Sequence, residues 1–165
     1  MINLDEFLKY LDSLGFSLGT GVPCSYFKDL LLAINEYNAI LYVPATREDE
    51  AVGIACGFSL GEKKAFVIMQ NSGFANIGDA LTSLVQLYKV PLLIFISYRG
   101  LKDDGDLPEH SLMGKVTEDV LRAYKIPYWI LMEDRWKAIL EKALYKMTQT
   151  SLPVCLLVEN GVLCK

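Results

Sequence analysis

The sequence has no long apolar segment, no strong net charge and only one histidine among its 165 residues. No apolar run approaches the ~18 residues that a membrane-spanning helix needs, and the acidic start of the chain lacks the basic region of a signal peptide. Sixteen Lys and Arg against twenty Asp and Glu give a net charge of −4, and no basic cluster is larger than Lys63-Lys64. We therefore expect a cytoplasmic protein that binds no membrane and no nucleic acid.

Metal-binding and nucleotide-binding patterns are also missing. The four cysteines show neither CxxC nor Cys/His ligand spacing, which predicts reduced thiols and excludes a zinc site. No glycine-rich dinucleotide motif or P-loop is present. The acidic string Asp103-Asp104-Gly105-Asp106 lies in a polar loop without a following helix. We interpret this string as a solvated turn, and we expect no metal site in the chain.

What the sequence does contain is a regular alternation of strands and helices. Apolar runs predict strands at 16–18, 39–43, 65–69, 91–96, 128–131 and 154–158, and helical periodicity predicts helices from residue 4 and near 26–35, 48–60, 75–87, 115–124 and 135–147. Three of the strands are apolar on both faces, which is typical of a parallel sheet covered by helices on each side. The prediction is one α/β domain over residues 1–165, a doubly wound three-layer α/β/α fold with a mostly parallel sheet of about six strands.

Ligands of such sheets bind beyond the carboxyl ends of the strands. In this chain those ends lead into the loops 19–25, 44–48, 70–74 and 97–114, which hold most of the chemically unusual side chains. They are Cys24, Arg47, Glu48, Gln70, Asn71, Arg99 and His110. Ser25 is a candidate N-cap for the helix that follows it, and Ser72-Gly73 are candidate caps for the helix after residue 70.

The segment 48–60 is the most informative helix. Its first turn carries Glu48, Asp49 and Glu50, and a helix N-terminus favours acids; for Asp49 and Glu50 this electrostatic role is sufficient. Gly53 and Gly57 each cost about 1 kcal/mol in a helix interior. We therefore expect another helix or a ligand to approach this backbone closely. A carboxylate at the start of such a helix is partly desolvated and can share a proton with a ligand nitrogen.

Four motifs then occur in register: Val22-Pro23-Cys24-Ser25, Thr46-Arg47-Glu48-Asp49-Glu50-Ala51, Met69-Gln70-Asn71-Ser72-Gly73 and Arg99-Gly100. Together with the spacing from Glu48 to Gly57-Phe58, they resemble the pyrimidine-binding domain of thiamine-diphosphate enzymes. Their order is similar to that in phosphonopyruvate and sulfopyruvate decarboxylases, and the resemblance covers nearly the whole chain. The chain is also similar in length to the free-standing α subunit of the sulfopyruvate enzymes.

The resemblance implies a role for each matching residue. Glu48 would exchange a proton with N1′ of the cofactor's aminopyrimidine, and His110 would relay a proton or bind the substrate. Cofactor-binding residues would be Pro23, Glu48, Gln70, Asn71, Ser72 and Gly73. Substrate-binding residues would be Cys24, Ser25, Arg47, Arg99 and His110, with the two arginines converging on a second anionic group of the substrate.

The resemblance further implies the α subunit of a heteromeric decarboxylase that uses thiamine diphosphate. Because the chain lacks the pyrophosphate-binding domain, a β subunit would hold Mg²⁺ and the diphosphate. The expected reaction converts 3-sulfopyruvate to sulfoacetaldehyde and CO₂, a step of coenzyme M biosynthesis. His110 favours phosphonopyruvate instead, so that substrate stays an alternative. A non-catalytic, flavodoxin-like binding module is a second alternative, because composition and sheet pattern alone also fit it.

Overall fold

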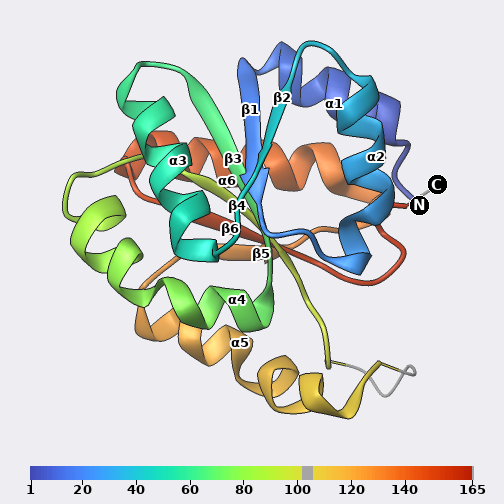
Figure 1. Ribbon diagram of the computed structural model, residues 1–165, viewed down its shortest axis with the longest axis vertical. Coiled ribbons are helices and arrows are strands. Elements are labelled where there is room, and N and C mark those ends of the chain that lie inside the picture. The colour runs from blue at the N-terminus through green and yellow to red at the C-terminus, as the bar shows by residue number, and fades with distance from the viewer. Residues whose placement is uncertain (102–105, 165) are drawn as a thin grey trace.

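The computed structural model describes residues 1–101 and 106–164. In this part of the chain six strands form one sheet in the order β2-β1-β3-β4-β6-β5, and every neighbouring pair is parallel (Figure 1). The strands are β1 (Phe16–Gly21), β2 (Leu41–Pro44), β3 (Lys64–Gln70), β4 (Leu93–Ser97), β5 (Tyr128–Ile130) and β6 (Val154–Val158). The predicted parallel α/β sheet is confirmed.

Helices cover both faces of this sheet, as Figure 1 shows. One face packs against α1 (Leu4–Ser13), α2 (Lys28–Glu36) and α6 (Trp136–Thr150). The other packs against α3 (Glu48–Leu60), α5 (Ser111–Ala123) and the helical segment that starts with α4 (Asn71–Phe74) and continues through η2 (Ala75–Ile77) into the π-helical η3 (Ala80–Gln86). Strand β3 serves both cores, because Phe66 and Ile68 face the first and Val67 and Met69 the second.

Two helices begin about one turn earlier than their apolar patterns predict. The segment after β3 begins at Asn71 rather than 75, and α5 begins at Ser111 rather than 115, after the short 3₁₀ turn η4 (Pro108–His110). Neither start carries a capping side-chain hydrogen bond: Gln70 and His110 occupy the N-cap positions without one. The predicted capping by Ser72-Gly73 is therefore wrong, since both lie inside α4.

The strand order places a topological switch point between β1 and β3 at the carboxyl edge of the sheet. The chain leaves β1 toward β2 on one side, and β3 pairs with β1 on the other side. Such a switch point leaves a gap between the two outgoing connections, where ligands of doubly wound sheets bind. The loop after β1 carries Cys24, and Gln70 ends β3. The topology therefore brings these two predicted site residues to the same edge.

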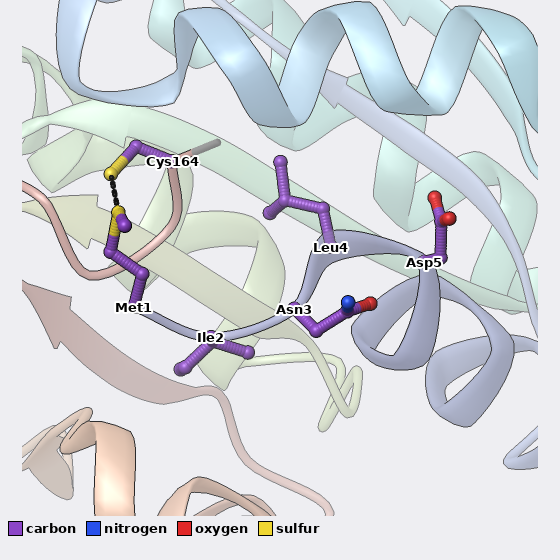
Figure 2. A pocket seen from close by; sticks show the side chains of 6 residues that line it. All are labelled: Met1, Ile2, Asn3, Leu4, Asp5 and Cys164. Carbon is purple, nitrogen blue, oxygen red and sulfur yellow. Dashed lines mark hydrogen bonds between the residues drawn. The ribbon is translucent and has the colours of Figure 1, made fainter.

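The two ends of the described chain meet beside α1. The backbone N–H of Ile2 donates to the carbonyl of Val162 at 2.9 Å, and a cavity of about 290 Å³ opens between the first residues and Cys164, whose Sγ lies 3.1 Å from Sδ of Met1 (Figure 2). The lining of this cavity contains none of the predicted site residues. Among the described helices, none combines the length and apolar character needed to cross a lipid bilayer.

Candidate active site

The three acids at the start of α3 have different partners. Asp49 accepts from Nε of Arg47 at 3.0 Å, and Glu50 accepts from the backbone N–H and the hydroxyl of Thr46 at 2.8 and 2.7 Å. These hydrogen bonds, from Arg47 and from Thr46 respectively, lower the pKa of Asp49 and that of Glu50. Both acids thus stabilise the helix start, as the sequence predicts.

Glu48 instead turns toward α4. Its carboxylate lies against Gly73, where an added Cβ would come within 2.3 Å of Oε1. The side-chain amide of Asn76 donates to Oε2 at 3.4 Å. The half-buried Glu48 is therefore seated in a gap that the missing side chain of Gly73 leaves between the two helices. Of the three acids, Glu48 is the one whose hydrogen-bond partner lies on the neighbouring helical segment and not at the start of α3.

The face of α3 beyond Glu48 is open. A Cβ added at Gly53 or Gly57 would meet nothing within 4 Å, and both residues are exposed. Leu60 at the end of the helix is also exposed, with 66% of its surface accessible. The described part of the chain supplies no close neighbour to these glycines. The close approach that was predicted from the unfavourable helix propensity of Gly53 and Gly57 therefore stays a prediction, and it would have to come from another molecule.

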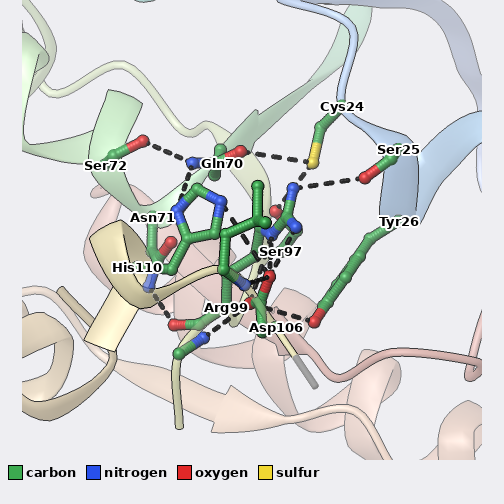
Figure 3. Close-up of polar contacts among 12 residues, drawn as sticks. Cys24, Ser25, Tyr26, Gln70, Asn71, Ser72, Ser97, Arg99, Asp106 and His110 are labelled. Atoms are coloured by element: carbon green, nitrogen blue, oxygen red, sulfur yellow. Dashed lines mark hydrogen bonds and ion pairs between the residues drawn. The ribbon is translucent and has the colours of Figure 1, made fainter. Parts of the chain in front are cut away.

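A second group of side chains gathers around Gln70 (Figure 3). Its Nε2 donates to the hydroxyl of Ser72 at 2.7 Å and lies 3.3 Å from Nδ1 of His110, and its Oε1 faces Sγ of Cys24 at 3.7 Å. The Cys24 thiol also lies 3.2 Å from the hydroxyl of Ser97. Four segments that are distant in sequence thus meet at the carboxyl edge, as expected from the parallel sheet.

A close backbone contact holds His110 at this edge. Gly100 has φ +72°, and a Cβ there would lie 2.0 Å from the carbonyl oxygen of His110. Only glycine combines this conformation with this approach. The residue after Arg99 therefore lets the η4 turn pack against the end of β4, with the His110 side chain 13% exposed.

Arg99 is paired with Asp106, an acid that the sequence predicted to be solvated. Its guanidinium forms an ion pair with Asp106, and the two side chains are 14% and 4% exposed. The guanidinium lies over the ring of Tyr26, 4.8 Å from its centre, and Nη1 donates to the hydroxyl of Ser25 at 3.2 Å. The interpretation of Asp106 as part of a solvated turn is therefore wrong, whereas residues 103–105 of that string lie outside the described residues.

Arg47 does not join Arg99. Its guanidinium pairs with Asp49, two residues further on, and 70% of its side chain is exposed. The expected convergence of the two arginines is therefore not found in this chain. Ser25 does not cap the next helix either, because the N-cap position of η1 (Ser25–Phe27) is occupied by Cys24. Its hydroxyl serves as an acceptor for Arg99 instead.

The last two predicted residues lie on either side of the site. Asn71 is fully buried, and its amide donates to the carbonyl of Arg99 at 2.8 Å and to the hydroxyl of Thr117 at 3.0 Å. It therefore ties β3, β4 and α5 together beneath the group around Gln70. Pro23 is exposed in the loop after β1. Within residues 1–101 and 106–164, no group of three or more His, Cys, Asp or Glu side chains could hold a metal ion.

Two residues of the site were missed at the sequence level. Ser97 is a polar residue that ends the apolar strand β4, a signal that could have identified it. Asp106 gives no such signal, because its partners Tyr26 and Arg99 are brought to it by the fold.

A carboxylate beside an open helix face and a polar cluster at the carboxyl edge of a parallel sheet suit an enzyme of the α/β class, and comparisons with known proteins agree. No protein-family model matches the sequence. The chain is 42% identical over 120 residues to the sulfopyruvate decarboxylase subunit alpha of Methanococcus maripaludis, covering 72% of this chain and 70% of that protein. It is 40% identical over 139 residues to the protein of the same name from Methanocaldococcus jannaschii, covering 82% and 80%.

Two longer proteins are also similar. Phosphonopyruvate decarboxylase of Streptomyces hygroscopicus is 32% identical over 166 residues, which cover 99% of this chain but 41% of that protein. The crystal structure of benzoylformate decarboxylase from Polynucleobacter necessarius matches the whole chain with a TM-score of 0.72 at 23% identity, over 31% of its own length. This likeness shows the fold and agrees with the predicted three-layer class.

The fold and the relatives together define a decarboxylase domain. More narrowly, the chain belongs to the family of the sulfopyruvate decarboxylase alpha subunits, with phosphonopyruvate decarboxylases as further relatives. The resemblance inferred from the four motifs is confirmed.

Proposed function

We propose that this chain is the pyrimidine-binding subunit of a cytoplasmic, heteromeric decarboxylase that uses thiamine diphosphate and converts 3-sulfopyruvate to sulfoacetaldehyde and CO₂, as in coenzyme M biosynthesis. The observation that carries the proposal is the position of Glu48. Its carboxylate is not used to cap α3 and is seated against Gly73 at the edge of an open face. Four free thiols suit a reducing compartment.

The residues present fit one end of thiamine diphosphate. A half-buried carboxylate can hold a proton at a ring nitrogen of an aminopyrimidine. On the same helix, the absence of side chains at Gly53 and Gly57 leaves space next to the backbone. The opposite end of the cofactor has no counterpart here, since no metal-binding group is found in the described residues. Mg²⁺ and the diphosphate would therefore be held by the partner subunit. The bound cofactor would supply the electron sink that lets CO₂ leave.

The chain's own residues would carry out proton transfer and substrate binding. Glu48 would hold and exchange the proton at the pyrimidine nitrogen. His110, fixed by Gln70, would deliver a proton to the product carbon or orient the 2-oxo acid. Arg99 and Ser25 would bind the anionic tail, for which a guanidinium is well suited. Cys24, whose thiol lies beside the hydroxyl of Ser97, would border this binding site on its buried side.

The open face of α3 supports the proposal that the chain binds a partner subunit. The relatives are named as alpha subunits, and each covers most of this chain. The exposed Gly53, Gly57 and Leu60 form a smooth surface that a second chain can approach closely. We propose that the β subunit packs here and encloses Glu48.

Replacing Glu48 tests the proposed function directly. The chain is produced with its partner subunit, thiamine diphosphate and Mg²⁺, and CO₂ release from 3-sulfopyruvate is measured. Glu48→Gln keeps the shape of the side chain but not its proton exchange, so we expect assembly to persist and kcat to fall by about 10²-fold or more. Asp49→Asn is the matched control, because this neighbouring acid pairs with Arg47 outside the site. An unchanged kcat in Glu48→Gln would reject the mechanism.

Phosphonopyruvate is the second candidate substrate, favoured by the 32% identity to a phosphonopyruvate decarboxylase. Both substrates carry a tetrahedral anion that Arg99 could bind, so the assay compares kcat/KM for the two. We expect 3-sulfopyruvate to give the higher value, and a higher value for phosphonopyruvate would reassign the substrate without changing the mechanism.

A further inference from the structure

Asp106 is bound more extensively than any other carboxylate near the site. Oδ1 accepts from Nη2 of Arg99 at 2.5 Å, and Nε of Arg99 lies 3.2 and 3.3 Å from the two carboxylate oxygens. The backbone N–H groups of Gly100 and Leu107 donate to the same carboxylate, each at 2.9 Å, and the hydroxyl of Tyr26 donates at 3.3 Å. A carboxylate with this many donors stays fixed and ionised at neutral pH.

The consequence for Arg99 is a single orientation. Asp106 occupies Nε and one N–H of Nη2, and Tyr26 supports the flat face of the guanidinium at 4.8 Å. Nη1 points to the hydroxyl of Ser25. A guanidinium carries five N–H donors, and within the described residues three of them are used. One N–H on each terminal nitrogen is left for a ligand.

We infer that Asp106 is a positioning residue that holds the Arg99 guanidinium with its free N–H groups ready for the sulfonate or phosphonate tail of the substrate. The inference rests on the proposed function, because it takes the tail to be the ligand of Arg99. Its physical basis is preorganisation: a long arginine side chain loses rotamer freedom on binding, and Asp106 fixes it beforehand. The hydrogen bonds from Arg99 also keep the pKa of Asp106 well below its usual range.

This role predicts an effect on binding rather than on the chemical step. In Asp106→Asn the ion pair is lost and Arg99 can rotate, so we expect KM for 3-sulfopyruvate to rise about tenfold. Oδ1 of Asp106 also lies 3.9 Å from Nε2 of His110, and because asparagine keeps a polar atom there we expect kcat to change less than threefold. Asp106→Glu keeps the charge on a longer side chain and should recover part of the loss. Asp119→Asn is the matched control, because it removes an exposed carboxylate paired with Arg122 on α5.

A double-mutant cycle separates positioning from a merely structural role. If Asp106 acts through Arg99, adding Asp106→Asn to Arg99→Ala raises KM by less than twofold. A full tenfold rise in that background, or a fall in kcat at unchanged KM, would overturn the inference. Thermal unfolding of each complex identifies a variant that fails to fold, and in that case Asp106→Glu and Arg99→Ala decide by the same KM comparison.

The Kd of 3-sulfopyruvate for each complex, measured by calorimetry, gives a readout that does not need turnover. A wild-type complex that binds the tail tightly and loses that affinity in Asp106→Asn supports the positioning role even when no CO₂ is released. The absence of CO₂ release would reject the proposed function alone. Equal Kd values for wild type and Asp106→Asn would reject the positioning role alone.

Discussion

Gly73→Ala is expected to disable Glu48 without unfolding the protein. The added Cβ would lie 2.3 Å from Oε1, 2.5 Å from Cδ and 2.6 Å from Cγ of Glu48, whereas ordinary contacts begin at 3.4 Å. The carboxylate must therefore move by about 1 Å or more, and a misplacement of that size costs on the order of 10²-fold in rate. The fold should tolerate the change, because the atoms that move end a flexible side chain and alanine suits a helix better than glycine.

The assay compares kcat for CO₂ release and the melting temperature of wild type, Gly73→Ala and Ala75→Ser, a control on the exposed side of the same segment. We expect kcat to fall about 10²-fold in Gly73→Ala alone, with a melting temperature within a few degrees of wild type. In a Glu48→Gln background the same substitution should cost little further activity, since the displaced group is already inactive. Wild-type turnover in Gly73→Ala would refute the assigned position of the carboxylate.

Three other outcomes can be checked. Gly57→Ala adds a methyl group where nothing lies within 4 Å, so it should stabilise the isolated chain by about 0.5–1 kcal/mol yet weaken partner binding, measured by thermal unfolding and calorimetry; unchanged affinity would remove α3 from the interface. Because the pKa of Asp106 is lowered in the folded protein, its carboxylate stabilises the fold above about pH 4 and loses this effect as the pH falls further. The difference in unfolding free energy between wild type and Asp106→Asn should therefore shrink from about pH 4 downward. A constant difference would contradict this. Burial raises the pKa of Cys56 to about 11, so iodoacetamide at pH 8 should modify the partly exposed Cys164 and spare Cys56, as mass spectrometry of the folded chain would show.

The parallel sheet could be predicted because its signal is local. Strands β3, β4 and β6 are buried on both faces, and such strands are nearly continuous apolar runs in the sequence. Helix starts were less accurate, because α4 and α5 begin without a capping side chain. The other local markers of a helix N-terminus, acids in the first turn and a proline at the first position, are also missing from both helices.

The site was predictable only as far as strand ends identify it. The fold brings Cys24, Gln70 and His110 together because parallel strands share a carboxyl edge. The pairing of charges was not predictable in the same way. Arg47 is bound by an acid two residues away, and Arg99 by Asp106 beyond a loop, and nothing in the composition of either segment distinguishes the two cases.

The two halves of the candidate site differ in what they need from a partner. The charge of Arg99 is already balanced and its orientation fixed by Asp106 within this chain, so the proposed tail-binding site would need no residue from a partner. Glu48 lies beside a face on which the described chain places nothing, and a carboxylate exchanges protons with a ring nitrogen most effectively when water is excluded. In the proposed function, recognition of the anionic tail would therefore belong to this subunit, whereas activation of the cofactor would require the partner that covers α3. A heteromer built in this way would couple turnover to assembly, because the acid would become enclosed only when both chains are present.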